Sequence, residues 1–268
     1  MSYIEHCLRE RGYAIIRKYI NQEQIDYLLE QYQIADNQPQ TNKNVPFVFV
    51  HKDIRWDIAS RIKQTMSISG LDVDILLPGC LFANASRGPT IWHQEHESFF
   101  TFQQTYNHLN FHITLTKPDP TKSGVCVVPF DVIKQQAPEY FDKLQNNGAT
   151  SFTDLKNATL MKDDANDTVC TIPFSFEKHK VIPDIGPGDL LLLRGDTIHR
   201  TQDGLTPRIA VSIHATQGSA IITNDVLTSG GKKKREVLIN NQNQFMPLVK
   251  FLRSKQTATV REWCERPR

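Results

Sequence analysis

The stretch GPGDLLLLRGDTIH, residues 186–199, decides the fold. Its first glycines and proline suit a tight turn, and the leucines at 190–193 suit a strand buried in the core of a two-sheet barrel. Gly195 and Asp196 suit a second turn, which leads into a short strand that carries His199. This order of turn, buried strand, turn and histidine predicts a β-rich fold that presents an imidazole from a strand.

Short β-rich runs, separated by Pro, Gly, Asn and Asp, continue this pattern through most of the chain after about residue 75. The predicted strands are 80–83, 109–116, 125–129, 180–183, 190–194, 197–201 and 209–213. Short strands at this spacing are typical of a sandwich or barrel. A polar insert at about 131–167 interrupts them, with a helix predicted at 135–144 and a loop at 162–168.

Helical patterns precede and follow the barrel. A strand at 12–17 is followed by Asn21 and Gln24, which stand in the positions of a capping box, and then by apolar residues at helical spacing. A second helix is predicted at 54–66, after a polar loop at 35–45. We therefore expect one domain: an N-terminal cover over about 1–70, a barrel core over about 75–216 and a C-terminal extension over about 220–268. The apolar residues of the extension predict a helix that packs on the body or forms a homodimer with a second subunit.

Composition excludes several classes of protein. The 268 residues carry 31 Lys and Arg against 29 Asp and Glu, so the net charge of +2 argues against a broad nucleic-acid or membrane surface. No apolar run approaches the ~20 residues of a membrane helix, and charges interrupt the first twenty residues where a signal peptide needs an apolar core. The five cysteines form no CxxC pair, so we expect a reduced, cytoplasmic protein whose metal sites do not use thiolates.

The segment WHQEHE, residues 92–97, holds the densest group of metal-ligand side chains. Residues i and i+2 of a strand share a face, so His93 and Glu95 would present an imidazole and a carboxylate side by side. His96 is an alternative ligand, but its same-face neighbour is Ser98 and not a carboxylate, so we favour His93. With His199, these two residues make a 2-His-1-carboxylate triad, the arrangement of non-haem Fe(II) oxygenases.

Arg208 follows nine residues after His199 and opens the strand RIAVSIHAT. A guanidinium directed into a barrel is costly unless it meets an anion, and it clamps a carboxylate well through two parallel hydrogen bonds. The distal carboxylate of 2-oxoglutarate, whose other end would chelate the iron, is the expected partner.

On these motifs the chain resembles the Fe(II)/2-oxoglutarate-dependent dioxygenases, and within them the phytanoyl-CoA dioxygenase-like group. The resemblance rests on HQE (93–95), SGVCVVP (123–129), PGDLLLLRGDTIH (187–199), Arg208 and the opening RGYAIIRKYINQEQID (11–26). It implies a mainly β fold with peripheral helices, the double-stranded β-helix or jelly roll. It also implies O₂ activation coupled to conversion of 2-oxoglutarate to succinate and CO₂. By the same resemblance His93, Glu95 and His199 would hold the iron, and Arg208 would clamp the cosubstrate.

Two positions depart from the family pattern. Glu95 stands where aspartate is commoner; an acidic residue there argues against halogenation, which needs space for chloride beside the metal. Many relatives carry serine two residues after the arginine, where this chain has Ala210, so Ser212 is a weaker candidate for binding the cosubstrate.

Further candidates each have a structural alternative. Asn110 and His112 alternate with apolar residues on the strand 109–116 and would bind the cosubstrate carboxylate next to the metal, or serve as structural polar groups. Trp92 and Phe100 flank the metal motif and would form a substrate wall, or pack in the core. His214 is expected in the core or behind the ligands. The basic run 232–235 is expected to be a solvated loop, or to contact an anionic group of the substrate.

The sequence therefore predicts an oxygenase that hydroxylates an aliphatic C–H of a small molecule and uses Fe(II), 2-oxoglutarate and O₂. Two alternatives stay open: a metal-dependent cupin enzyme that does not use 2-oxoglutarate, and a non-catalytic binding protein on the same fold. The sequence identifies no substrate.

Overall fold

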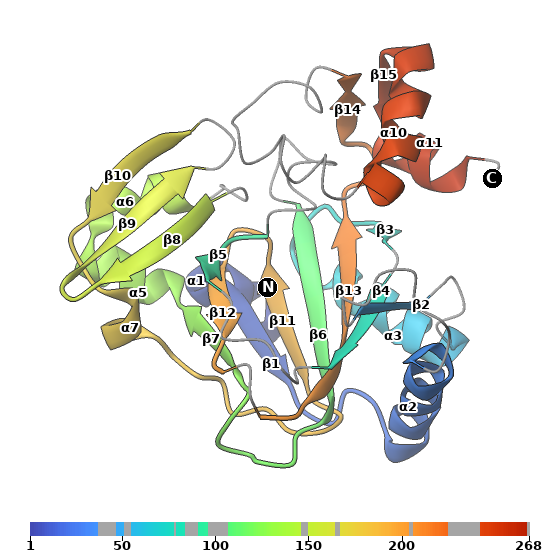
Figure 1. The fold of residues 1–268 in the computed structure, drawn as a ribbon, viewed down its shortest axis with the longest axis horizontal. Helices are drawn as coiled ribbons and strands as arrows, with labels where there is room; N and C mark the ends of the chain where they lie inside the picture. The colour runs from blue at the N-terminus through green and yellow to red at the C-terminus, as the bar shows by residue number, and fades with distance from the viewer. Residues whose placement is uncertain are drawn as a thin grey trace.

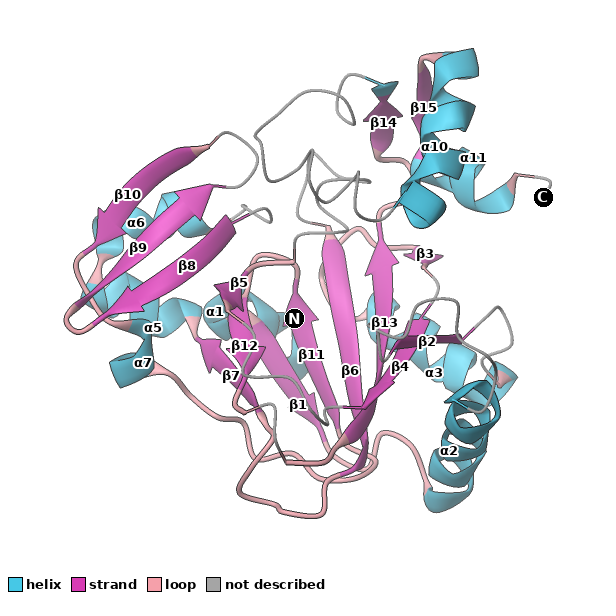
Figure 2. Ribbon diagram, in the orientation of Figure 1, coloured by secondary structure: helices cyan, strands magenta, loops and turns pink. Residues whose placement is uncertain are grey.

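The computed structural model describes residues 1–36, 47–50, 55–77, 79–83, 91–95, 107–145, 150–163, 167–203, 206–224 and 242–266. Two antiparallel sheets form its centre, with helices around them (Figures 1 and 2). One sheet has seven strands, in the order β1-β11-β6-β13-β4-β2 with β3 also paired to β13. The other has six, in the order β10-β9-β8-β5-β12-β7.

The strands of the seven-stranded sheet come from both halves of the chain. They are β1 (Tyr13–Ile16), β2 (Phe47–Val50), β3 (Ile75–Leu76), β4 (Gly79–Ala83), β6 (His108–Thr116), β11 (Leu190–Arg194) and β13 (Ile209–Thr216). The strands of the six-stranded sheet are β5 (Trp92–His93), β7 (Val125–Val128), β8 (Thr150–Leu155), β9 (Ala158–Asp163), β10 (Thr168–Ile172) and β12 (Ile198–Thr201). The sequence therefore predicted a mainly β fold with peripheral helices correctly.

Three helices cover the outer face of the seven-stranded sheet: α1 (Tyr3–Arg11), α2 (Gln22–Asp36) and α3 (Trp56–Ser67). The capping box predicted for α2 is present, since Asn21 and Gln24 exchange backbone-to-side-chain hydrogen bonds of 2.9 Å each. Helix α1 was not predicted. At the start of α1, the Ser2 side chain accepts a hydrogen bond from the Glu5 backbone amide. The helix ends at Gly12, which has the left-handed conformation with φ 80°.

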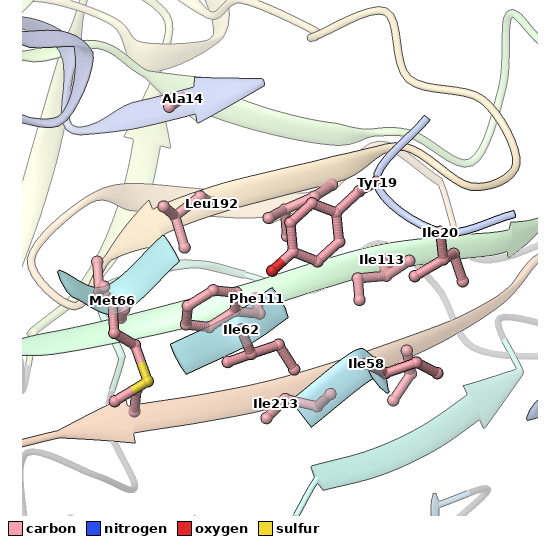
Figure 3. Close-up of a cluster of buried hydrophobic side chains, with 14 of the residues drawn as sticks. Ala14, Tyr19, Ile20, Ile58, Ile62, Met66, Phe111, Ile113, Leu192 and Ile213 are labelled. Carbon is pink, nitrogen blue, oxygen red and sulfur yellow. The ribbon is translucent and has the colours of Figure 1, made fainter. Parts of the chain in front are cut away.

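The residues between these helices and the sheet form the largest apolar cluster of the described chain. Phe111 and Ile113 of β6, Leu192 of β11 and Ile213 of β13 pack there against Ile62 and its neighbours on α3 (Figure 3). Each of these five side chains has at most 1% of its surface exposed. Burial of this apolar face attaches the helical cover to the sheet and fixes which face of β6 and β13 points inward.

The run of leucines in β11 is buried on both faces. Leu190 and Leu192 face the helices, whereas Leu191 and Leu193 pack between the two sheets, with Tyr13 and the valines of β7. The turn before β11 depends on Gly188, whose φ is 83° and where a Cβ would lie 2.7 Å from the Ile20 carbonyl oxygen. This confirms the predicted buried strand and the predicted tight turn.

The segment that was expected to be a polar insert extends the six-stranded sheet instead. Strands β8 and β9 lie within it and pair with each other, and β8 also pairs with β5. Helices α5 (Phe130–Gln136), α6 (Pro138–Leu144) and α7 (Phe176–His179) pack around this part, and Ala137 separates the first two. The predicted strand at 180–183 is wrong, because only a single bridge between Val181 and Val127 forms there.

The C-terminal part is built from β14 (Ile221–Thr223), α10 (Gln242–Lys255), β15 (Thr257–Thr259) and α11 (Val260–Glu265). It has its own apolar cluster, which includes Leu248, Leu252 and Trp263 and reaches β3 through Ile75. No described helix combines the length and apolar character of a membrane span.

Candidate metal and cosubstrate site

Two histidines face each other where β5 and β12 pair. His93 and His199 are direct cross-strand partners, and their ring centroids lie 4.4 Å apart. The Nδ1 atom of His93 lies 2.8 Å from the Ile91 carbonyl oxygen, and that of His199 lies 2.9 Å from the Thr197 carbonyl oxygen. A carbonyl only accepts, so each Nδ1 carries a hydrogen, and the neutral form of each ring has its lone pair on Nε2. Metal-binding histidines are typically oriented in this way.

Glu95 lies two residues beyond His93 and faces both sheets. Its backbone amide donates to the Gly195 carbonyl at 2.9 Å, which attaches it to the turn before β12. Desolvation raises the pKa of its carboxyl group, but the imidazoles of His214, His199, His108 and His93 lower it more strongly, so the net pKa is below the ordinary range. Glu95 is therefore a carboxylate at neutral pH, placed among four imidazoles.

The tightest group of ligand atoms around Glu95 differs from the predicted one. One ligand atom each of Glu95, His108 and His214 lies within 4.8 Å of the other two, and His93 and His199 are outside this group. His108 was not considered from the sequence, and His214 was expected behind the ligands or in the core. Strand alternation could have identified both, because His108 precedes Asn110 by two residues and His214 follows Ser212 by two.

Asn110 and Ser212 connect Glu95 to His214 through a chain of hydrogen bonds. Asn110 Nδ2 donates to Glu95 Oε2 at 3.1 Å, and Ser212 Oγ donates to Asn110 Oδ1 at 2.7 Å. Ser212 Oγ also lies 3.2 Å from His214 Nε2. Since the hydroxyl hydrogen is directed at Asn110, His214 Nε2 is the donor in this last contact. The structure thus connects two of the four predicted cosubstrate residues, Asn110 and Ser212, to the Glu95 carboxylate and to His214.

Arg208 is the largest side chain that the described chain buries completely, with 1% exposed. It stands directly before β13, and its Nη1 donates to the Ser123 carbonyl oxygen at 2.5 Å. Burial lowers the pKa of Arg208 to about 10, against the opposing effect of Asp203, so the guanidinium stays charged at neutral pH. A buried cation of this kind suits a carboxylate ligand.

His112 lies within electrostatic range of both Arg208 and His199. Its burial, and then the charges of Arg208 and His199, hold its pKa well below the ordinary value for histidine. It is a neutral imidazole between the buried cation and the first histidine pair. Electrostatic interactions and hydrogen bonds therefore connect predicted site residues of the two sheets, His112 with His199 and Asn110 with Glu95.

Trp92 lies on the opposite face of β5 from His93. Its side chain is 3% exposed and packs in the cluster below the six-stranded sheet, with its ring edge-on to Phe176 at 6.0 Å. Its Nε1 donates to Glu177 at 2.7 Å, and the Arg200 guanidinium lies 5.0 Å from the ring centre. Its role as a substrate wall stays a prediction. Phe100, His96 and the basic run 232–235 lie outside the described residues.

No protein-family model and no curated protein sequence matches the chain. Solved structures do match it over most of its length. EctD from S. alaskensis in its apoform is 11% identical, with 87% of this chain and 85% of that chain covered and a TM-score of 0.57. The epimerase SnoN in complex with Fe³⁺, alpha ketoglutarate and nogalamycin RO is 14% identical, with 82% and 84% covered and a TM-score of 0.56. EvdO2 from Micromonospora carbonacea var. aurantiaca, complexed with 2-oxoglutarate, is 16% identical, with 80% and 90% covered and a TM-score of 0.53.

These likenesses establish the fold of the chain. They confirm the jelly roll and, at the level of fold, the resemblance to non-haem iron and 2-oxoglutarate-dependent enzymes. They do not single out the phytanoyl-CoA dioxygenase-like group, which stays a prediction.

Proposed function

We propose that the protein is an Fe(II)- and 2-oxoglutarate-dependent oxygenase that hydroxylates an aliphatic C–H of a small molecule. In the overall reaction, 2-oxoglutarate, O₂ and the substrate give succinate, CO₂ and the hydroxylated product. One observation carries the proposal: His93 and His199 are cross-strand partners with ring centroids 4.4 Å apart and each Nδ1 beside a backbone carbonyl, while Glu95 follows His93 by two residues and interacts electrostatically with both rings.

The donor set fits iron in chemical terms. Two neutral imidazoles and one carboxylate are the protein ligands of non-haem Fe(II) oxygenases, and His93, His199 and Glu95 would hold the metal. When bound, such a metal binds and activates O₂ while leaving positions for a chelating cosubstrate. The backbone carbonyls of Ile91 and Thr197 hold the tautomers of the two histidines, and Asn110 orients the Glu95 carboxylate.

Arg208 and His112 would serve the cosubstrate. The guanidinium, held by the Ser123 carbonyl, would bind the distal carboxylate of 2-oxoglutarate. His112 stays neutral between Arg208 and His199, so it can exchange a hydrogen bond with the cosubstrate without adding a charge. An apolar cluster of β1, β7 and β11 packs between the same two sheets.

Succinate release tests the proposal directly. The protein, loaded with Fe(II) under argon, is mixed with 2-oxoglutarate, O₂ and a panel of metabolites, and succinate and product masses are measured. We expect a substrate in the panel to stimulate succinate formation and to gain one oxygen atom. If product forms when 2-oxoglutarate is left out, the protein is instead a metal-dependent cupin enzyme. If a metabolite binds but is not converted, the protein is a non-catalytic binding protein. A product of unchanged mass or two hydrogens fewer would retain the cosubstrate but exclude hydroxylation.

Replacement of Arg208 tests the cosubstrate assignment. Arg208→Ala should raise the KM for 2-oxoglutarate by roughly 10–100-fold, the loss expected for a charge-assisted hydrogen-bonded pair. Arg208→Lys keeps the charge but loses the planar pair of donors, so its KM for 2-oxoglutarate should lie between those of the wild type and Arg208→Ala. Circular dichroism establishes that the variants are folded, and an unchanged KM in a folded Ala variant would contradict the assignment.

A further inference from the structure

The pair His108 and His214 stands on the inner face of neighbouring strands, opposite Glu95. His214 is the cross-strand partner of Asn110 in β6, two residues along from His108, and the two imidazole ring centroids lie 5.1 Å apart. Their ligand atoms and a carboxylate oxygen of Glu95 all lie within 4.8 Å of one another. The proposed function uses neither histidine.

His108 is the most informative member of this pair. Only 2% of its surface is exposed, and neither ring nitrogen has a hydrogen-bond partner among the described residues. A buried polar group left in this way costs about 1–3 kcal/mol, so it requires an explanation, and a bound ion is one that the neighbouring carboxylate and imidazole favour. A neutral imidazole has a hydrogen on one ring nitrogen and a lone pair on the other, so in that form His108 offers one ligand atom.

The tautomer of His214 adds a second lone pair. Its Nε2 donates to Ser212 Oγ, whose own hydrogen is directed at Asn110. In the neutral form of the ring, the lone pair is therefore on Nδ1. Two imidazole nitrogens and one carboxylate oxygen are a donor set suited to divalent first-row metals, such as Co²⁺ or Zn²⁺.

We propose that His108, His214 and Glu95 form a second position for a divalent transition-metal ion, with the Glu95 carboxylate shared between this position and the pair His93 and His199. Each position then has two imidazoles of its own, and the shared carboxylate couples them. This inference goes beyond the proposed function, because the oxygenase reaction needs one metal only.

Metal stoichiometry tests the inference without any activity measurement. The apoprotein is incubated with Co²⁺, desalted and analysed for bound cobalt by mass spectrometry, and affinities are measured by calorimetry. The variants are His108→Gln/His214→Gln for the second position and His93→Gln/His199→Gln for the first. His179→Gln is the control, because it removes an imidazole that packs against Phe174, outside both proposed positions. Circular dichroism and thermal unfolding establish that each variant is folded.

We expect two equivalents of Co²⁺ in the wild type and in His179→Gln, and one equivalent in each double variant. Glu95→Gln should weaken both equivalents by at least tenfold, which two independent sites would not show. One equivalent in the wild type that survives His108→Gln/His214→Gln would overturn the second position and leave the proposed function intact. A different result is one equivalent of Co²⁺ in the wild type that is kept by His93→Gln/His199→Gln and lost by His108→Gln/His214→Gln. It would support the position at His108 and His214 and contradict the ligand set of the proposed function.

Discussion

The two faces of β6 and β13 carry different kinds of side chain. The outer face carries Phe111, Ile113 and Ile213, which pack against the helices and contain no polar atoms. The inner face, one residue along in each strand, carries His112, Thr114 and other polar side chains that are buried just as deeply. The same strands therefore support a stabilising apolar core on one side and a buried polar surface, which can bind ligands, on the other.

This difference indicates how the fold stays stable although it buries a polar site. Burial of polar groups between sheets is unfavourable, whereas burial of large apolar side chains supplies the main stabilising free energy. We therefore expect outer-face substitutions to change stability and inner-face substitutions to change ligand binding and turnover.

The largest expected effect comes from His199 on the inner side. His199→Gln removes an Nε2 lone pair of the first histidine pair and should lower 2-oxoglutarate-dependent succinate formation by at least about 100-fold, since ligand loss also disturbs metal affinity. Its midpoint of thermal unfolding without metal should stay within a few degrees of the wild type. Succinate formation at a wild-type rate would show that His199 is not a ligand.

Phe111 on the outer face should show the opposite behaviour. Phe111→Ala leaves a cavity between β6 and α3 and should lower the free energy of unfolding by about 3–5 kcal/mol, measured by urea titration. The folded fraction should keep its affinity for metal and 2-oxoglutarate. A variant with wild-type stability but weakened metal binding would break the separation between the two faces.

Tyr19 gives the outer cluster a pH dependence. Burial raises the pKa of its phenol to about 12, against opposing contributions from Thr65 and Arg61, while the unfolded chain has a pKa near 10. The native state keeps this proton after the unfolded state has released it, so stability is present below pH 10 and is lost as pH rises towards 12. Between pH 10 and 12, Tyr19→Phe should therefore lose about 2–3 kcal/mol less of its free energy of unfolding than the wild type does. If the urea midpoints of the wild type and Tyr19→Phe changed identically over this pH range, the prediction would be contradicted.

Two neighbouring residues of β6 provide the smallest and most closely matched comparison. Ile113→Val on the outer face should lower the free energy of unfolding by about 0.5–1.5 kcal/mol. Thr114 on the inner face is completely buried, and its hydroxyl has no hydrogen-bond partner among the described residues. Thr114→Val should therefore be neutral or stabilising by less than about 1 kcal/mol. A destabilisation by Thr114→Val larger than that by Ile113→Val would contradict this interpretation.

Local patterns identified much of this architecture. The alternation of β6, the buried leucines of β11 and the capping box at Asn21 all depend on neighbours within a few residues, so their period and residue types predict them. The strands β8 and β9 were missed because their polar, partly exposed residues resemble a surface loop until β9 pairs with β8 and β8 pairs with β5. Helix α1 was missed because its apolar stripe is only Ile4, Cys7 and Leu8.

The sequence by itself determined which residue types are available for the site: the HQE motif, His199, Arg208 and the inward face of β6. Only the tertiary structure decided which of them meet. Asn110 contacts Glu95 across 15 positions of the chain and Ser212 across 102, and His108 and His214 join the same carboxylate from two paired strands. Such distances depend on register and sheet packing, which arise from the whole core and not from any local pattern.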